Sequence, residues 1–204
     1  MNLSATQVIL GATNLSNAQE TGRLIPEIAG VYVHEHFALK HLEGSLVVEN
    51  DLTLIKLKEP VDFEVHRGQI APICLPSEQM VVSKSDCQIA GWGRVHTNEK
   101  NHGPLKYADV QLLSAAECNH LRGPHKHPLT DANICAGYRD HHTCRGDSGG
   151  DLGCRSSSNP NQWILVGVDS FGPKICESNA PSMFVNVVKQ LAWIEATMRA
   201  HANN

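Results

Sequence analysis

The stretch Cys144-Arg145-Gly146-Asp147-Ser148-Gly149-Gly150 decides how this chain is interpreted. A serine that follows an aspartate and stands between glycines predicts a nucleophile in a tight turn. Glycines let the backbone come close to a bound carbonyl, because they carry no Cβ. Backbone N–H groups at Gly146 and Ser148 would then stabilise the oxyanion of an acyl-transfer intermediate.

The composition is that of an ordinary globular protein with room for one or two cores. The 204 residues are 41% hydrophobic and 19% charged, and the net charge is −4. This charge gives no sign of nucleic-acid or membrane binding. No apolar run approaches the ~18–20 residues of a membrane span. From the charge and from the lack of such a run, we expect neither a nucleic acid nor a membrane as partner.

Seven cysteines argue for an oxidising compartment and therefore for a secreted, extracellular protein. The residues after Met1 lack the basic start and apolar core of a signal peptide. We therefore expect that an N-terminal segment of the protein precedes this chain.

Short apolar runs separated by Gly, Pro and Asn indicate an all-β chain, either a barrel or a sandwich. They predict strands over residues 7–12, 24–33, 52–57, 87–92, 105–113, 133–136, 163–170 and 183–187. Ser114 and Glu117 have the spacing of a capping box and predict the start of a helix. Residues 187–200 predict a closing helix with one apolar face, formed by Val187, Leu191, Ile194 and Met198.

The pattern Gly-Asp-Ser-Gly-Gly at 146–150 resembles the active-site motif of the trypsin/chymotrypsin family of serine endopeptidases. Other segments resemble further landmarks of that family, in the right order and over nearly the whole chain. They are Asn50-Asp51-Leu-Thr-Leu-Ile-Lys-Leu57, Ile73-Cys-Leu-Pro76, Gly91-Trp-Gly93, Asn133-Ile-Cys-Ala-Gly137, Val168-Asp-Ser-Phe-Gly172, Ala180-Pro-Ser-Met-Phe184 and Leu191-Ala-Trp-Ile194.

The resemblance implies a fold of two perpendicular β-barrels with the active site between them. Relative to that fold the chain begins late. We expect residues 1–72 to be a remnant of the first barrel, and residues 73–204 to hold the complete second barrel and the closing helix. The catalytic histidine and the activation cleavage site would then belong to the missing part.

The resemblance makes Ser148 the nucleophile and Asp51 the carboxylate that orients the catalytic histidine. Serine is a weak nucleophile at neutral pH and needs such a base. We interpret the histidines near the expected cleft rim as exposed loop residues; they are His34, His36 and His41. A second group could bind only an adventitious metal: His120, His125 and His127. Glu20 is the sole acidic residue of the 11–22 loop, too few for calcium, and we expect no metal and no cofactor.

Asp147 has a second role in the family, where it binds the N-terminal ammonium that activation releases. Met1 lies on the wrong side of the missing segment to supply that group. A buried carboxylate without a partner is costly, so we expect a zymogen-like, poorly formed oxyanion hole.

The resemblance also implies three disulfides: Cys87–Cys154, Cys118–Cys135 and Cys144–Cys176. Cys74 is left over. In multidomain members its counterpart tethers the catalytic domain to a separate N-terminal segment, and the alternative is an inert buried thiol.

The substrate pocket departs from the family pattern. His142 stands at the expected floor, where trypsin-like members carry aspartate, and Ser182 replaces a glycine that keeps the pocket open. The wall and the edge that pairs with substrate would be formed by Ser170, Phe171 and Gly172. These residues favour small, polar or acidic substrate side chains over basic ones. Asp151 replaces the proline that usually follows the motif.

Two functions fit the sequence. The first is a serine endopeptidase that acts on polypeptides through an acyl-enzyme on Ser148, with the histidine segment missing from this chain. The second is a non-catalytic homologue that binds protein partners such as inhibitors. For this chain alone we expect no efficient catalysis.

Overall fold

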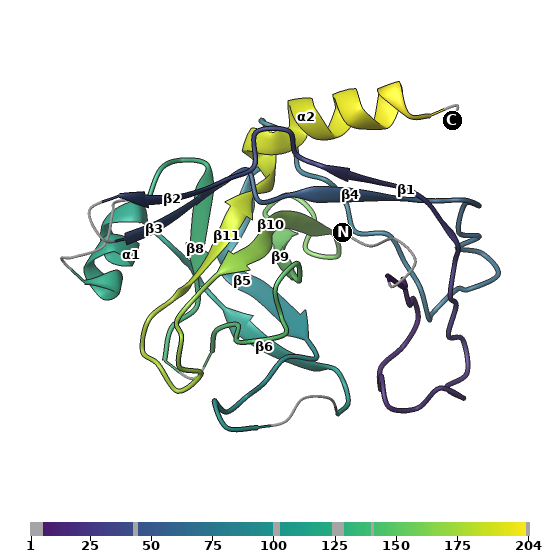
Figure 1. Cartoon of the computed structure of the whole chain (residues 1–204), viewed down its shortest axis with the longest axis horizontal. Helices are drawn as coiled ribbons and strands as arrows, with labels where there is room; N and C mark the ends of the chain where they lie inside the picture. The colour runs from purple at the N-terminus through teal and green to yellow at the C-terminus, as the bar shows by residue number, and fades with distance from the viewer. Residues whose placement is uncertain (1–5, 43–44, 100–102, 124–128, 140, 203–204) are drawn as a thin grey trace.

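The computed structural model describes residues 6–42, 45–99, 103–123, 129–139 and 141–202. The fold is mostly β, with a curled seven-stranded sheet and a C-terminal helix, as Figure 1 shows. This confirms the all-β class. The elements are β1 (Ile28–Val33), β2 (Ala38–Leu42), β3 (Ser45–Glu49), β4 (Thr53–Leu57), β5 (Val82–Gly91), β6 (Lys106–Val110), β7 (Leu112–Leu113), α1 (Ala115–Arg122), β8 (Asn133–Ala136), β9 (Asp151–Ser156), β10 (Trp163–Phe171), β11 (Ser182–Asn186) and α2 (Val187–Ala200).

The seven-stranded sheet is antiparallel and has the order β6-β5-β9-β10-β11-β8-β7. Its two edge strands, β6 and β7, follow one another in the chain with only Gln111 between them. The sheet must therefore curl until its edges approach. Its concave side holds the main core, which includes Leu152, Ile164 and Phe184, all fully buried.

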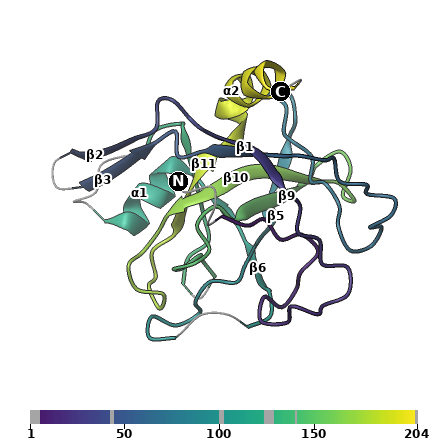
Figure 2. The ribbon, with the colours of Figure 1, turned by 45° about the vertical axis from the view of Figure 1, so that its right-hand side comes forward.

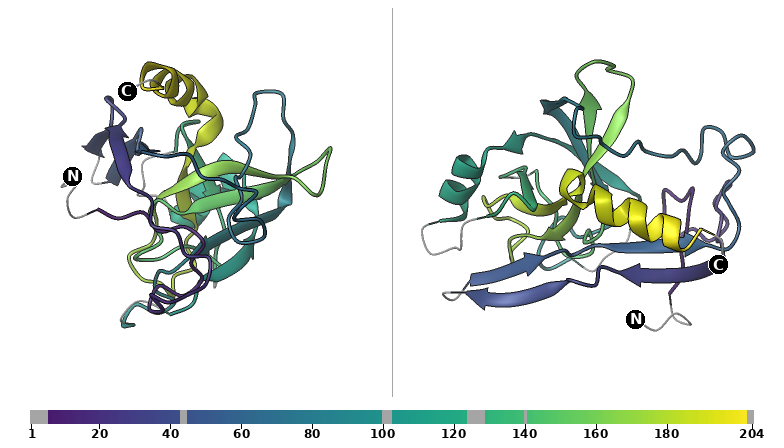
Figure 3. Two further views of the ribbon diagram at one scale, coloured as in Figure 1. Left: turned by 90° about the vertical axis from the view of Figure 1, so that its right-hand side faces the viewer. Right: turned by 90° about the horizontal axis from the view of Figure 1, so that it is seen from above.

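The residues before this sheet form two further antiparallel ladders, β1 with β4 and β2 with β3. Seen from above in Figure 3, the two ladders lie end to end and α2 runs alongside β1 and β4. Val187 and Ile194 of α2 pack on Leu52, the residue before β4. The closing helix thus joins the first ladder to the large sheet.

The segment before β1 contacts the loop between β5 and β6, as Figure 2 shows for the purple trace. The carbonyl of Thr13 accepts hydrogen bonds from Leu105 N (2.5 Å) and from the Trp92 indole (3.2 Å). Residues far apart in the chain therefore fix this loop, which borders the candidate site.

Most of the predicted strands form, and the limits of β8 are as predicted. The strand over 7–12 is wrong, since only Leu10 makes a bridge there, to Leu24. β2, β3 and β9 were not predicted. β9 carries Asp151, Gly153 and Arg155, a composition atypical of strands, yet it lies between β5 and β10 where both neighbours stabilise it.

Both predicted helices are confirmed. Ser114 and Glu117 form the reciprocal capping box at the start of α1. Val187 and Ile194 are buried as expected, but Met198 is 58% exposed. In the described part of the chain, no helix has the length and apolar character needed to cross a membrane.

Candidate active site

The turn that carries Ser148 lies in the connection from β8 to β9 and is hydrogen-bonded to β10. Within the turn, Asp147 N donates to Cys144 O (3.1 Å) and Gly150 N to Asp147 O (2.7 Å). Gly149 N donates to the carbonyl of Asp169 on β10 (2.9 Å). These bonds leave Ser148 exposed at the tip of the turn, where a nucleophile is accessible.

The backbone N–H groups of Gly146 and Ser148 are the candidate oxyanion donors. Among the described residues, no acceptor takes a hydrogen bond from the N–H of Gly146 or of Ser148. Gly146 has a φ of 101°, a conformation that side-chain-bearing residues rarely adopt. Free N–H groups next to a nucleophile have the chemistry of an oxyanion hole.

Asp51 lies within reach of the same strand, β10. Its Oδ2 accepts a hydrogen bond from Ser170 Oγ at 2.7 Å. The preceding residue, Asn50, has a φ of 51°. Both the nitrogen and the oxygen of its side-chain amide form hydrogen bonds. Its Nδ2 donates to His36 O (3.1 Å), and its Oδ1 accepts from Gln190 of α2 (3.0 Å). The structure therefore connects the predicted carboxylate, Asp51, to the predicted pocket residue, Ser170.

The carboxylate of Asp147, a member of the same turn, accepts two backbone hydrogen bonds. Its Oδ1 accepts from Gly93 N (2.8 Å) and its Oδ2 from Cys144 N (3.0 Å). A Cβ on Gly91 would meet Oδ1 at 2.0 Å, and a Cβ on Gly93 would meet Cγ at 2.4 Å. The Gly91-Trp92-Gly93 segment thus makes the space in which this carboxylate lies.

Asp147 also lines a cavity of about 440 Å³, together with His142, Lys106 and Arg94. His142 Nδ1 lies 2.9 Å from Thr143 O, and its Nε2 is buried without a hydrogen-bond partner among the described residues. No described basic side chain forms an ion pair with Asp147. His142 is therefore found in the cavity beside Asp147, and its role at the pocket floor stays a prediction.

A buried polar cluster, which we call the pocket cluster, is formed by Thr143, Asp169 and Ser182. The Thr143 hydroxyl donates to Asp169 Oδ1 (2.8 Å) and lies 2.7 Å from Ser182 Oγ. Thr143 N donates to the same Ser182 oxygen (3.0 Å). Burial raises the pKa of Asp169 to about 7, and the nearby charges of Asp147 and Asp51 act in the same direction.

Sequence reasoning found Ser182 but missed Thr143 and Asp169. A signal was present, because Asp169 is the one charged residue of the strand Trp163–Phe171. Gly172 borders the pocket cluster, because a Cβ on Gly172 would lie 3.3 Å from Ser182 Oγ. Gly172 is also exposed. Phe171 instead packs against the Cys118, Cys135 and Met183 cluster.

No described histidine makes a hydrogen bond with Ser148 or Asp51. His34 is buried and stacks on Trp193 of α2 with ring centroids 4.5 Å apart, and burial lowers its pKa. His36, His41 and His120 are exposed, whereas His125 and His127 lie outside the described residues.

In the described chain, one group has ligand atoms close enough for a metal ion: His34, Glu35 and His36. Two of its members already have partners. His34 Nδ1 accepts from His36 N (3.1 Å), and Glu35 Oε2 accepts from the Trp193 indole (2.7 Å). The carboxylate of Glu20 is likewise used within its own loop, where it accepts from Thr13 N and Asn14 N (both within 3.0 Å).

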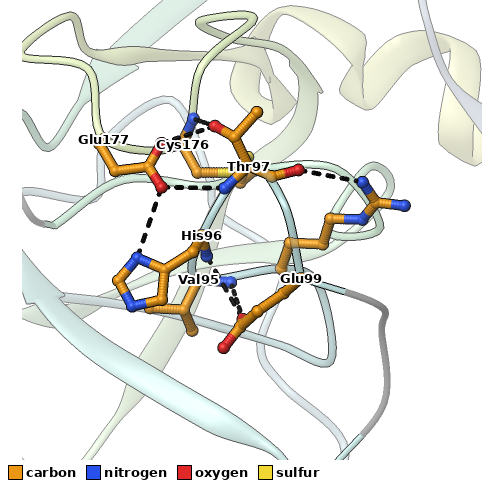
Figure 4. A network of polar contacts seen from close by, with 8 residues as sticks. Val95, His96, Thr97, Glu99, Cys176 and Glu177 are labelled. Carbon is orange, nitrogen blue, oxygen red and sulfur yellow. Dashed lines mark hydrogen bonds and ion pairs between the residues drawn. A yellow bond between two sulfur atoms is a disulfide. The ribbon is translucent and has the colours of Figure 1, made fainter.

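A network of polar contacts, drawn in Figure 4, connects the loop after β5 to the loop that carries Cys176. Glu177 accepts from Thr97 N (3.0 Å) and Thr97 Oγ1 (2.5 Å), while Thr97 Oγ1 accepts from Cys176 N (2.9 Å). The Thr97 hydroxyl is the main cause that lowers the pKa of Glu177 to about 2. His96 lies 3.4 Å from the same carboxylate.

The structure contains the three disulfides that the resemblance implied, Cys87–Cys154, Cys118–Cys135 and Cys144–Cys176. The third attaches the turn that carries Ser148 to the loop of Figure 4. Cys74 is free and exposed, so the alternative of a buried thiol is wrong.

Comparison with protein families agrees with this geometry. The family model described as Trypsin matches the chain over residues 2–194. The match includes Asp51, Asp147, Ser148, Ser170 and the pocket cluster.

Proposed function

Because this chain belongs to the trypsin family, we propose that it is the catalytic domain of a serine endopeptidase with Ser148 as nucleophile. The observation that carries the proposal is the convergence of two distant segments on β10. Ser148 is held beside Asp169 by the Gly149 hydrogen bond, and Asp51 is bonded to the next residue, Ser170. Nucleophile and carboxylate therefore share one strand as their support.

In the proposed reaction, Ser148 Oγ attacks the carbonyl carbon of a peptide bond. A general base takes the hydroxyl proton and later passes it to the leaving amine, which yields an acyl-enzyme that water hydrolyses. The free N–H groups of Gly146 and Ser148 would stabilise the tetrahedral oxyanion. Asp51 would orient the base and stabilise its protonated form.

We propose that the base is a histidine supplied by a longer form of the protein, because no described histidine makes a hydrogen bond with Ser148 or Asp51. Removing the base of a serine protease triad costs about a million-fold in turnover. Little activity is therefore expected from the 204-residue chain by itself.

The cavity beside Asp147 supports an activation step. Its carboxylate accepts two backbone hydrogen bonds and has no cationic partner among the described residues. We propose that a new N-terminal ammonium enters this cavity and pairs with Asp147. The pair would fix the Cys144-to-Ser148 turn and with it the oxyanion donors.

The three disulfides and the family support a secreted or extracellular location, with polypeptide substrates or inhibitors as partners. Cys74 is the exposed free thiol, and we propose that it is the point of attachment for a disulfide-linked N-terminal segment.

Labelling with a fluorophosphonate tests the enzyme proposal, because this reagent reacts with activated serines. We expect covalent labelling of Ser148 in an N-terminally extended form, and none in its Ser148→Ala variant. Absence of labelling in a folded, extended and activated protein would overturn the proposal.

A non-catalytic binding module is the second candidate. It is favoured by the absence of a hydrogen bond between Ser148 and any described histidine, and by Asp151 in place of the usual proline. The same labelling experiment separates the two, since a binding module would capture polypeptide ligands without reacting at Ser148.

A further inference from the structure

The loop between Gly11 and Arg23 carries a sequence motif that the proposed function does not use. Asn14-Leu15-Ser16 has the pattern Asn-X-Ser, with X other than proline, which enzymes of the secretory pathway recognise when they attach a glycan to asparagine. The same pattern occurs at Asn2-Leu3-Ser4, outside the described residues. Such a short pattern also arises by chance, so the geometry at Asn14 has to show whether its side chain is available.

Asn14 forms a turn with the serine of its own motif. Its side-chain oxygen, Oδ1, accepts a hydrogen bond from Ser16 N at 3.0 Å. This arrangement is an Asx turn, in which an asparagine side chain bonds to the backbone two residues further along the chain. The turn uses the oxygen of the Asn14 amide. It leaves the nitrogen, Nδ2, which is the atom to which a glycan is attached.

The Nδ2 atom of Asn14 has no hydrogen-bond partner among the described residues. In the described part of the chain, the single buried side-chain nitrogen or oxygen without a partner is His142 Nε2. Asn14 is partly exposed, so its unbonded Nδ2 would belong with that atom if it were buried. The nitrogen that the modification requires is therefore in contact with solvent.

The backbone of Asn14 stabilises the loop independently of Nδ2. Asn14 N donates to Glu20 Oε2 (3.0 Å), and the Asn14 carbonyl accepts from Asn17 N (3.0 Å). Asn14 also forms a β-bridge with Pro104, in the loop between β5 and β6. Because none of these contacts uses Nδ2, a glycan attached to this atom leaves the hydrogen bonds of the loop in place.

We propose that Asn14 is a modification site that carries an N-linked glycan. In the transfer, Nδ2 forms a bond to the anomeric carbon of an oligosaccharide that is linked to a lipid diphosphate. The bond between that carbon and the diphosphate oxygen breaks, the lipid diphosphate leaves, and the amide nitrogen loses a proton. The inference goes beyond the proposed function, because it holds whether or not Ser148 reacts.

The test is translation of the chain behind a cleavable signal peptide, in the presence of microsomes that contain the glycan-transferring enzyme. Enzymatic removal of an N-glycan converts the modified asparagine to aspartate, so peptide mapping distinguishes Asn14 from Asn2. We expect a glycan at Asn14 in the wild type and in Ser16→Thr, and none at this position in Asn14→Gln or Ser16→Ala. Ser148→Ala should be modified at Asn14 as the wild type is, so this proposal and the enzyme proposal fail independently.

Asn17 is the matched control within the same loop. Its Oδ1 accepts from Gln19 N at 3.1 Å, so it forms the same kind of turn, but Gln19 stands where the motif requires serine or threonine. Asn17 should therefore carry no glycan in the wild type and should gain one in Gln19→Thr. A translocated wild-type chain that is unmodified at Asn14 would overturn the inference, and modification of Asn17 in Gln19→Thr would show that the enzyme does act on this loop.

The folded chain should also tolerate the glycan. We expect the glycosylated chain and the same chain trimmed to a single sugar to unfold at the same urea concentration, because Nδ2 makes no contact that the glycan replaces. A glycosylated chain that unfolds at a clearly lower urea concentration than the trimmed chain would contradict attachment to the loop as it is folded.

Discussion

Ser170 Oγ donates a hydrogen bond of 2.7 Å to Asp51 Oδ2 across 119 positions of the chain. The bond joins the segment before β4 to β10, the strand that is hydrogen-bonded to the turn carrying Ser148. A hydrogen bond to a charged group typically contributes about 1.5–3 kcal/mol, and this pair is only partly buried. We therefore expect a coupling of about 1.5 kcal/mol between Asp51 and Ser170.

A double-mutant cycle measures that coupling. The variants are Asp51→Ala, Ser170→Ala and their combination, and the quantity is the free energy of unfolding in urea. Additive effects of the two single substitutions would show that the bond does not stabilise the fold.

Asp169 should make stability depend on pH. An unfolded aspartate titrates near 3.8, whereas Asp169 in the folded chain titrates at about 7. Between these values the folded state holds a proton that the unfolded chain has lost, so this group lowers stability as the pH rises. Asp169→Asn should match the wild type near pH 4 and exceed it by about 2–4 kcal/mol near pH 8.

Urea unfolding of both proteins at the two pH values checks this prediction. Asp86→Asn serves as the control for removal of an exposed carboxylate and should show no such difference. A constant difference between Asp169→Asn and the wild type at both pH values would contradict the shifted titration.

Gly93→Ala should displace Asp147. The added Cβ would lie 2.4 Å from Asp147 Cγ, closer than real Cβ atoms come, so the carboxylate must leave its bonds to Gly93 N and Cys144 N. We expect a loss of about 1–3 kcal/mol in unfolding free energy, and slower fluorophosphonate labelling of Ser148 when Gly93→Ala is made in the N-terminally extended form. Gly103→Ala is the matched control, because a Cβ there meets no atom within 4 Å.

Thr97→Val should loosen the loops drawn in Figure 4. Valine keeps the shape of threonine but loses the hydroxyl that donates to Glu177 and accepts from Cys176 N. Hydrogen exchange measured by mass spectrometry should rise in peptides that contain residues 95–97 and 176–177. Thr130→Val alters an exposed threonine outside this network and should leave both peptides protected as before.

The same network should weaken in acid. The pKa of Glu177 is lowered to about 2 from a usual value of 4.5, chiefly by the Thr97 hydroxyl. Its contribution to stability is present above pH 4.5 and is lost as the pH falls toward 2. Glu177→Gln should remove this part of the acid sensitivity, which exchange protection of the Thr97 amide at pH 3 and pH 6 would report after correction for the intrinsic rate.

Cys74 should react as the exposed free thiol of the folded chain. A thiol reagent such as DTNB should modify one cysteine per chain without denaturant, and none in Cys74→Ser. The six other cysteines are paired and should react only after reduction. Modification of more than one thiol in the folded wild type would contradict the pairing.

Local patterns in the sequence predicted much of the fold. The capping box at Ser114 and the apolar periodicity of residues 187–200 involve neighbours one turn apart, so the sequence alone located α1 and α2. Strand β9 was not predicted, because its stability comes from pairing with β5 and β10 on either side. The residues of β9 give no indication of those neighbours.

The sequence by itself determined the motif around Ser148 and, through its resemblance to the trypsin family, the family and the three disulfide pairs. Only the tertiary structure decided what surrounds Asp169, Asp147 and His142. The motif is contiguous and can be read along the chain. By contrast, Asp169 meets Thr143 and Ser182 because β10 and β11 are paired beside the nucleophile turn in a curled sheet. Contacts of this kind depend on strand register and curl, which place residues together that the chain keeps far apart.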